Sequence, residues 1–403
     1  MQGGVADYTW HLAHKLAEMD AQVSILTSVK AAPPPCEEPS RSTALRRGLP
    51  RKTSGEPAAA IAVYPIITSW GPGCWRQLDR FLHEYRPDVL HLQYQAAAYD
   101  LTGWVNWLPW RLRRRLGRPR TVVTFHDLRV PYVFPKAGRL RQWSILGLAR
   151  HADAVITTNA EDEQALRQHA WATHVERIPL GSNIDAQPPA GFDRTGWRCQ
   201  RGIGDTQVLL AYFGFLSQSK GGEDLILTLD RLLSHGHDAH LLMIGGQVGD
   251  VDATNRAYLE RVRSLIRERA LDERVHWTGH TSAAEVSANL LAADVVVMPY
   301  RDGVSFRRTT FIAALHHGCA VVTTSPAVAL PELRPGENVL LAPAGDVEAL
   351  AGAVAQLARD AVLTARLRAG AQALGSTFDW GEIARRTWQV YAGLAEAHRQ
   401  VGA

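Results

Sequence analysis

Short apolar runs alternate with segments of helical period along most of the chain. Runs rich in valine, isoleucine and leucine between polar turns are typical of strands, and each is followed by the spacing of an amphipathic helix. Such alternation predicts an α/β protein with parallel sheets covered by helices. The predicted strands cover residues 22–27, 60–64, 89–93, 120–125 and 154–157 in the first half, and 207–213, 240–244, 275–277, 295–298 and 320–324 in the second.

Two domains are expected because a chain of 403 residues is too long for one core of ordinary size. The polar segment 185–192 separates the two series of strands, and we interpret it as the hinge between domains at 1–185 and 186–375. In doubly wound domains ligands bind beyond the carboxyl ends of the strands, so two facing domains are expected to hold one ligand in a central cleft. The stretch 31–57 is predicted to be a long, mobile polar loop.

Composition narrows the function classes. The chain is 46% hydrophobic and 21% charged with a net charge of +4, a globular profile that is too balanced for nucleic acid to be the main partner. No apolar run reaches the roughly 18 residues needed to span a bilayer, and the first residues lack the order of a signal peptide. The cysteines are far apart, which suggests neither a zinc site nor a disulfide framework and fits a reducing cytoplasm. They are Cys36, Cys74, Cys199 and Cys319.

The segment 302–310 lies between a predicted buried strand and a predicted helix that runs from about Phe306 to His317. It places Arg307 and Arg308 in the first turn of that helix, where the positive end of the helix dipole disfavours cations unless an anion is bound. A phosphate group is the natural anion for such a place. The alternative is that both arginines are solvated at the tip of a loop.

A series of short motifs follows in order along nearly the whole chain. Together they make the chain resemble the GT-B glycosyltransferases of family 4, a large group of retaining nucleotide-sugar enzymes. The motifs are Gly3-Gly4-Val5-Ala6-Asp7-Tyr8, Thr124-Phe125-His126-Asp127, Ile178-Pro179-Leu180-Gly181-Ser182-Asn183, Gly214-Phe215-Leu216 with Lys220-Gly221, Ala293-Asp294-Val295-Val296-Val297-Met298-Pro299, Pro331-Glu332-Leu333 to Gly336-Glu337-Asn338, and Phe378-Asp379-Trp380.

The resemblance implies two Rossmann-like doubly wound domains that face a central cleft. The first domain would hold the acceptor, the second the nucleotide-sugar donor, and a final helix over 376–403 would cross back to the first domain. It also implies that no metal and no other cofactor is needed, because the family neutralises phosphate with side chains. The acceptor would be a glycan, a lipid-linked sugar or a small molecule.

The resemblance assigns roles to individual residues. Lys220 would bind the donor diphosphate, and Gly3 with Gly4 would allow the backbone to approach the phosphate and the sugar from the other side. His126, at the end of a predicted strand, would hydrogen-bond the donor sugar, and the leaving diphosphate could take the acceptor proton, so no protein base is named. The alternatives are a solvated loop lysine at Lys220 and a histidine at His126 that caps the following segment. His91, at another strand end, is expected to be structural or to lie on the acceptor side.

Three features depart from the family pattern. The family's Glu-x7-Glu motif is replaced by Ser305 and Ala313, which leaves recognition of the ribose unassigned. The arginine that usually follows the glycine of the lysine loop is Phe215, so one phosphate charge lacks a partner. We expect Arg307 or Arg308 to replace it, with Ser305 capping the helix and Thr309 or Thr310 nearby. The third departure is that the apolar strand that usually precedes the Gly-Gly loop is absent. Either the assigned start is late or the chain is a fragment, and we predict that an in-frame upstream start encodes the strand.

The segment from Trp104 to Arg118 concentrates tryptophans and arginines. That mixture suits an anionic membrane surface, where each cation near the lipid contributes roughly 1 kcal/mol. It predicts peripheral contact with the inner face of the membrane and a lipid-linked acceptor. An ordinary basic helix end with partly buried tryptophans explains it equally well.

The motifs and residues together predict a cytoplasmic hexosyltransferase that uses a nucleotide sugar, with retention of anomeric configuration and a role in polysaccharide biosynthesis. Two alternatives remain open. One is a non-catalytic GT-B-like protein that binds a sugar nucleotide or a glycan. The other is a sugar-nucleotide epimerase, a class that depends on paired carboxylates in the cleft.

Overall fold

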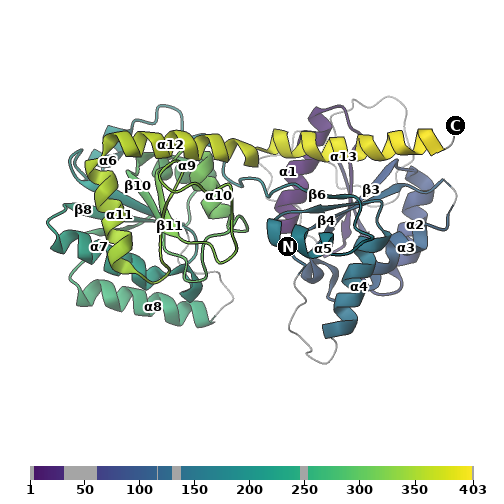
Figure 1. Ribbon diagram of the computed structural model, residues 1–403, viewed down its shortest axis with the longest axis horizontal. Helices are drawn as coiled ribbons and strands as arrows, with labels where there is room; N and C mark the ends of the chain where they lie inside the picture. Colours follow the sequence, from purple (N-terminus) through teal and green to yellow (C-terminus); the bar gives the residue numbers. More distant parts are fainter. Residues whose placement is uncertain (1–3, 31–60, 116, 129–137, 246–252, 402–403) are drawn as a thin grey trace. The chain divides into compact units, whose positions relative to one another are not determined.

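The computed structural model describes residues 4–30, 61–115, 117–128, 138–245 and 253–401. The chain divides into two compact units (Figure 1). Unit 1 consists of Met1–Leu180 together with Trp380–Ala403, and unit 2 of Gly181–Asp379. Gly3 and the polar loop predicted at 31–57 lie outside the described residues.

Unit 1 contains two parallel sheets. Strand β1 pairs with β2 in one sheet, and the other has the order β3-β4-β5-β6. The strands are β1 (Ser24–Ser28), β2 (Ala62–Ile67), β3 (Val89–Tyr94), β4 (Arg120–Phe125), β5 (Ala154–Thr157) and β6 (Val175–Arg177). The helices are α1 (Gly4–Glu18), α2 (Cys74–Tyr85), η1 (Ala96–Tyr99), η2 (Trp104–Trp107), α3 (Leu108–Leu112), α4 (Gly138–His151), α5 (Ala160–Arg167) and α13 (Trp380–Val401).

The four-stranded sheet of unit 1 is buried on both faces, which is why its strands read as continuous apolar runs. On one face Val123 and Phe125 pack with residues of α2, α3 and α4. On the other face Val122 and Ile156 pack with residues of α1 and α13, among them Tyr8 and Ile383. Successive side chains of β4 therefore face opposite sides of the sheet, and the helices α1 and α13 both cover one of these sides.

Unit 2 is a single doubly wound parallel sheet with the order β9-β8-β7-β10-β11-β12. The strand order reverses between β7 and β10, and this reversal is where open α/β sheets bind ligands. The strands are β7 (Val208–Phe213), β8 (Ala239–Ile244), β9 (Val275–Trp277), β10 (Val295–Met298), β11 (Val321–Thr324) and β12 (Leu340–Ala342).

Helices surround the sheet of unit 2 (Figure 1). Among them, α7 packs with both α8 and α11, α6 packs with α9, and α10 packs with α12. The helices are α6 (Arg194–Cys199), η4 (Gln218–Lys220), α7 (Gly222–Ser234), α8 (Ala253–Glu268), α9 (Ala283–Ala292), α10 (Thr309–His316), α11 (Val347–Arg359), α12 (Ala361–Gly375) and η5 (Ser376–Phe378). The α/β architecture expected from the hydrophobic pattern is confirmed.

The structure differs from the sequence-based expectation in two places. Strands β6 and β12 were not predicted, because each is only three residues long and carries little periodic signal. Helix α10 begins at Thr309 rather than at Phe306. Phe306 is instead buried in the loop before the helix, where its ring lies 5.0 Å from that of Phe378, and this contact holds the preceding backbone out of the helix.

Candidate functional site

The loop that follows β7 reaches the switch point through two glycines with positive φ. Gly214, directly after the strand, has φ +129°, and Gly221, the N-cap of α7, has φ +69°. A Cβ at Gly221 would lie 1.9 Å from the carbonyl oxygen of Pro299, so only glycine lets this loop pack against the end of β10. The loop carrying Lys220 is therefore held close to the loop after β10.

Arg301 joins these two loops. Its backbone N–H donates to the carbonyl of Ser219 at 2.9 Å. Its guanidinium donates two hydrogen bonds of 2.8 Å to the carboxylate of Asp224, which is buried in the first turn of α7. A bidentate pair of this kind fixes direction as well as distance. The position of Lys220 is thus fixed from both sides.

Lys220 lies in a small polar group at the carboxyl ends of β7 and β10. Its Nζ is 3.9 Å from the place that a Cβ on Gly214 would occupy, and Cγ2 of Thr310 is 3.3 Å from the same place. Within the described ranges, no carboxylate forms an ion pair with Lys220. Burial, followed by the nearby charge of Arg308, lowers the pKa of Lys220 below its usual value. An anion bound here would relieve both effects.

Arg308 is the second cation of this group. Its guanidinium lies over the ring of Tyr300, 4.8 Å from the centroid, and its NH2 donates to Asp302 Oδ1 at 2.7 Å. Tyr300 is fully buried and its pKa is raised to about 12 by that burial, so its hydroxyl stays protonated at neutral pH. Asp302 is exposed, and its carboxylate accepts from Arg308 at a place where a phosphate oxygen could accept instead.

The helices that begin at the switch point lack side-chain caps. In unit 2 the side chains of Asp193, Asp346 and Asp360 cap α6, α11 and α12, and Ser282 forms a capping box on α9. By contrast, the N-cap residues of α7 and α10 make no side-chain hydrogen bond to their helices. In α7 the N–H of Glu223 donates to the hydroxyl of Tyr258 at 3.1 Å. The other N–H groups at the two helix starts can donate to an anion, which the positive ends of the helix dipoles also favour.

The other predicted residues of this loop have different positions from those expected. Ser305 does not cap α10: the N-cap is Arg308, and the carbonyl of Ser305 accepts the Arg308 N–H at 3.1 Å in a turn. The expected cap was wrong because the helix starts three residues later than predicted. Arg307 is half-buried in that turn, and Thr309 is the first residue of the helix.

The remaining predicted residues belong to unit 1. Gly4 is exposed at the start of α1. His126 follows β4 and is half-buried, with its Nε2 3.0 Å from Gln93 Oε1 and its ring edge-on to that of Tyr8 at 4.7 Å. Burial lowers the pKa of His126 to about 4, so its imidazole is neutral at pH 7. Gln93 was not predicted, although its spacing of two from His91 on one strand could have indicated it.

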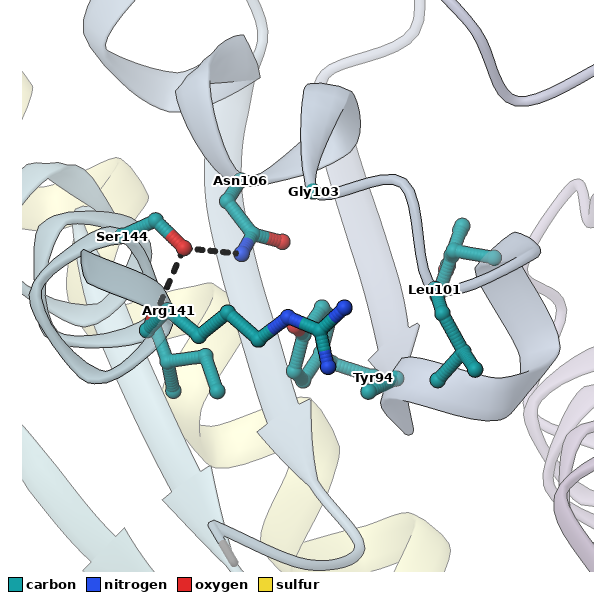
Figure 2. Close-up of a pocket in the computed structure, with 9 residues that line it drawn as sticks. Tyr94, Leu101, Gly103, Asn106, Arg141 and Ser144 are labelled. Atoms are coloured by element: carbon teal, nitrogen blue, oxygen red, sulfur yellow. Dashed lines mark hydrogen bonds between the residues drawn. The ribbon is translucent and has the colours of Figure 1, made fainter. Parts of the chain in front are cut away.

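A small cavity lies beyond the carboxyl end of β3 (Figure 2). Its volume of about 30 Å³ is enough for one or two waters and far below the several hundred Å³ of a sugar site. Asn106 donates from Nδ2 to Ser144 Oγ at 3.0 Å, whereas its buried Oδ1 finds no partner within the described ranges. The cavity therefore suits ordered water rather than a substrate.

In the described part of the chain, no group of three or more histidine, cysteine, aspartate or glutamate side chains is arranged to hold a metal ion. None of the helices in those ranges combines the length and the hydrophobicity needed to span a bilayer.

Solved structures define the class of fold. A sucrose-phosphate synthase from Thermosynechococcus elongatus has a TM-score of 0.67 at 22% identity, over 98% of this chain and 94% of that one. A glycosyltransferase from Rickettsia africae has a TM-score of 0.71 at 17% identity, over 98% and 96%. The HepE protein of Anabaena, solved with UDP and glucose, has a TM-score of 0.63 at 20% identity, over 83% and 87%. The fold is that of the GT-B glycosyltransferases.

Sequence comparisons give the family. The model of the glycosyl transferase 4-like domain matches residues 3–181, and that of the glycosyl transferases group 1 matches residues 207–360. A phosphatidyl-myo-inositol mannosyltransferase from Mycobacterium leprae is 27% identical over 406 residues, 99% of this chain and 95% of the relative. A D-inositol 3-phosphate glycosyltransferase from Streptomyces avermitilis is 23% identical over 99% of this chain and 84% of that protein.

The chain belongs to the group 1 family of glycosyltransferases, and it is a nucleotide-sugar-dependent hexosyltransferase. The predicted family and enzyme class are thereby confirmed. A non-catalytic binding protein and an epimerase are not favoured by these matches.

Proposed function

We propose that this enzyme binds the diphosphate of its donor at the switch point of unit 2, between Lys220 and Arg308. The observation that carries the proposal is that a half-buried lysine without a carboxylate partner, among the residues described, lies beside Arg308 and Thr310. Helices α7 and α10, whose N-cap residues make no side-chain cap, start in the same loops. Positioned cations and N–H groups are what the departure of a diphosphate requires.

The site also accounts for the position where the family has an arginine and this chain has Phe215. The side chain of Phe215 is exposed and carries no charge that could bind a phosphate. Arg308 supplies the second charge from the neighbouring loop, and Arg307, Ser305 and Thr309 line the remainder of that loop. The family resemblance also assigns the Gly3-Gly4 motif to the binding of the donor and His126 to contact with the transferred sugar.

The proposed reaction proceeds with retention of configuration. The bond from the anomeric carbon to the phosphate oxygen breaks, the acceptor oxygen bonds to the same face of that carbon, and the leaving diphosphate takes the acceptor proton. The neutral imidazole of His126 is not a base in this scheme. The anomeric configuration of the product, measured by NMR on a donor of known configuration, tests retention directly.

The acceptor is proposed to be a glycan or a lipid-linked acceptor, and a phosphorylated inositol is the first one to test. The mannosyltransferase and the D-inositol 3-phosphate glycosyltransferase that resemble this chain are both named for inositol-containing acceptors. Competition between free inositol phosphate and a lipid-linked form would distinguish a small-molecule acceptor from a membrane one.

A surface of unit 1 supports the proposal that the enzyme contacts the inner face of a membrane. Trp107 contacts Trp143 at 4.9 Å and Trp110 at 6.5 Å between ring centroids, so α4 extends the aromatic segment of η2 and α3. Trp143 is 60% exposed and Leu140, one turn before it, is 67% exposed. The guanidinium of Arg114 lies over Trp110 at 4.7 Å. Aromatic side chains beside arginines favour an anionic lipid surface.

Part of the basic charge in this segment has a structural role instead. Arg111 and Arg115 both form ion pairs with Asp79. Sedimentation with vesicles of phosphatidylglycerol, compared with vesicles of phosphatidylcholine, tests the contact. Binding to the anionic vesicles that weakens at high salt and in Trp143→Ser supports it, and equal recovery in the supernatant with both lipids would contradict it.

Donor binding tests the proposed site. Thermal shift assays with nucleoside diphosphates, UDP first because HepE was solved with it, should identify the base. Arg308→Ala should weaken binding of the stabilising nucleotide by about tenfold, the effect of one charge-assisted hydrogen bond. Arg334→Ala, which removes an exposed arginine paired with Glu337, is the matched control. If Arg307→Ala and Arg308→Ala both bind the nucleotide as tightly as the parent, the proposed site is wrong.

A further inference from the structure

A row of polar side chains lies on one face of the larger sheet in unit 1. Side chains alternate along a strand, so His91 and Gln93 of β3 share a face. Gln93 is paired with Thr124 in the register of β3 and β4, and the N–H of His126 continues the ladder by donating to the carbonyl of Tyr94 at 3.0 Å. These four side chains therefore lie under α1 and α13, on the same face as Val122.

Hydrogen bonds connect this row in a defined direction. Gln93 Oε1 is 3.0 Å from His126 Nε2, and Gln93 Nε2 is 3.3 Å from His91 Nε2. His91 is held by Thr124 Oγ1 at 2.7 Å and by the hydroxyl of Tyr391 at 2.6 Å. A carboxamide oxygen can only accept, so this arrangement requires that His126 Nε2 carries the proton. In the neutral ring the lone pair is then on Nδ1, which has no hydrogen-bond partner among the residues that the structure describes.

The contacts that orient the ring of His126 differ from the hydrogen bond that decides which of its nitrogens is protonated. Tyr8 contacts it edge-on with an interplanar angle of 81°, and Tyr8 itself packs against Trp380 at 5.1 Å. Packing from α1 and α13 therefore fixes the ring plane. The Gln93 amide is left to decide which nitrogen bears the hydrogen, because the two tautomers of imidazole differ little in energy by themselves.

We propose that Gln93 is a positioning residue that fixes His126 as the Nε2–H tautomer, so that Nδ1 is presented as an acceptor for a hydroxyl of the bound sugar. The second half of this proposal rests on the proposed contact between His126 and the donor. A hydrogen on Nδ1 would instead present a donor there and would repel a hydroxyl hydrogen that points toward the ring. Gln93 would thus act on the reaction without touching the sugar.

The tautomer is measured directly on the full chain without any substrate. Two-bond ¹H–¹⁵N correlation spectra of ¹⁵N-histidine-labelled protein at pH 7 distinguish the two tautomers, and His126→Gln assigns the signals. The parent should show the Nε2–H pattern for His126. Gln93→Leu should lose that exclusive pattern, whereas Gln93→Glu, whose carboxylate also accepts from Nε2, should keep it. Gln164→Leu, at an exposed position of α5, is the matched control and should leave the signals unchanged.

An Nδ1–H pattern in the parent, or an unchanged pattern in Gln93→Leu, would overturn the proposal, and the parent spectrum alone decides it if the variant does not fold. Kinetics then test the link to function. Gln93→Leu should lower kcat/KM for the donor by about tenfold, the value of one lost hydrogen bond, with recovery in Gln93→Glu. A changed tautomer with unchanged kcat/KM would confirm the positioning and refute the contact of His126 with the sugar.

Discussion

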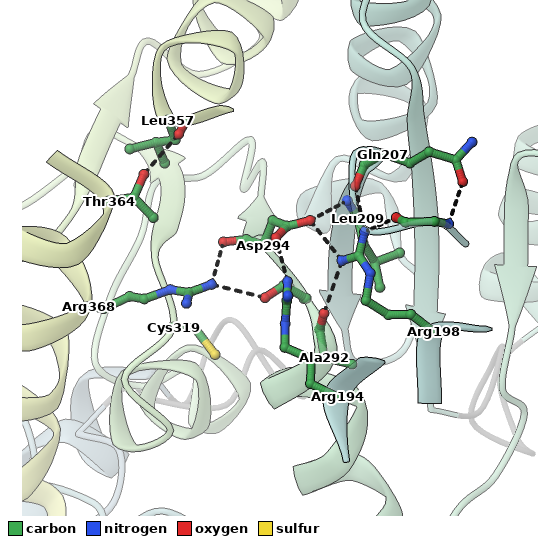
Figure 3. Close-up of polar contacts among 12 residues, drawn as sticks. Arg194, Arg198, Gln207, Leu209, Ala292, Asp294, Cys319, Leu357, Thr364 and Arg368 are labelled. Carbon is green, nitrogen blue, oxygen red and sulfur yellow. Dashed lines mark hydrogen bonds and ion pairs between the residues drawn. The ribbon is translucent and has the colours of Figure 1, made fainter. Parts of the chain in front are cut away.

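Cations gather at both ends of strand β10, but among the residues described only the carboxyl end has a cation, Lys220, whose side chain lacks a hydrogen-bond acceptor. At the amino end, Asp294 accepts from Arg194, from Arg198 at 2.9 Å and from the backbone N–H of Leu209 at 2.8 Å (Figure 3). Arg198 also donates to the carbonyls of Gly204 and Gln207, and Arg368 donates to the carbonyls of Ala293 and Asp294. At the carboxyl end, Lys220 has no such acceptors among the residues described.

This difference separates structure from function. The amino-end arginines donate to fixed carbonyls and to one shared carboxylate, so they tie α6 and α12 to the sheet. Only the buried Nε of each arginine is left without a partner among the residues described. The carboxyl-end cations lie at the switch point, beside the starts of two helices whose N-cap residues make no side-chain cap. The number of arginines in a loop therefore does not identify an anion site. An anion site is indicated where a cation lacks hydrogen-bond acceptors from the protein itself.

The largest effect is expected from Arg198→Ala at the amino end. Arg198 is fully buried and donates to Asp294 and several carbonyls, so its loss leaves buried acceptors without partners. We expect a loss of about 3–5 kcal/mol in unfolding free energy, as for other broken buried pairs. Urea denaturation measures it, with Arg334→Ala as the exposed control. An unchanged denaturation midpoint would refute the structural role of this cluster.

The next effect is expected from Lys220→Ala at the carboxyl end. Loss of one preorganised charge on the leaving group should lower kcat/KM by about 10²–10³-fold while stability changes little. Lys15→Ala, an exposed lysine paired with Glu18, is the control. Steady-state kinetics and a melting curve are measured on the same samples. A loss of activity that is explained by a lower melting temperature would contradict the assignment of Lys220 to the leaving diphosphate.

A smaller effect of opposite sign is expected from Asp302→Asn. The Asp302 carboxylate competes with phosphate for Arg308, and because Asp302 is exposed the pair contributes only about 0.2–1 kcal/mol. Nucleoside diphosphate should therefore bind up to about fivefold more tightly in the variant. Calorimetric titration at low salt measures this, and Glu337→Gln is the control at another exposed pair. Weaker binding in Asp302→Asn would mean that Arg308 needs Asp302 for its position.

The pH dependence of the carboxyl end follows from Lys220. Its pKa is lowered in the folded chain by burial and by Arg308, so between that value and the ordinary 10.5 the unfolded chain binds more protons. The ligand-free protein should gain stability as pH rises through this window, since the cost of a buried charge disappears. Diphosphate binding should fall over the same window, because it needs the ammonium. Lys220→Met should remove both trends, and their persistence in that variant would assign them to another group.

The smallest effect is expected from removal of metal ions. If side chains neutralise the diphosphate, donor turnover after treatment with EDTA and gel filtration should stay within about twofold of the untreated enzyme. Restoration of a lost activity by Mg²⁺ or Mn²⁺ would contradict the proposed role of the Lys220 and Arg308 pair.

Much of this fold was readable from the sequence, because strands buried on both faces leave long apolar runs. The runs at 120–125, 154–157 and 295–298 coincide with β4, β5 and β10. The family motifs placed Lys220 and its flanking glycine between a strand and a helix, and they lie there, with Lys220 at the end of the short helix η4 and Gly221 at the N-cap of α7. The start of α10 was misplaced since the burial of Phe306 against Phe378, 72 positions away, is a tertiary contact with no local signal.

The sequence by itself determined the class of fold, the family and the loops that carry the candidate cations, since apolar periodicity and glycine spacing are local properties. Only the tertiary structure decided which cations have partners. Arg301 meets Asp224 across 77 positions and Arg198 meets Asp294 across 96, so no window of the sequence reveals these pairs. A cation is available to a ligand only if no residue that is distant in the sequence pairs with it. Such cations could therefore be identified only in the folded chain.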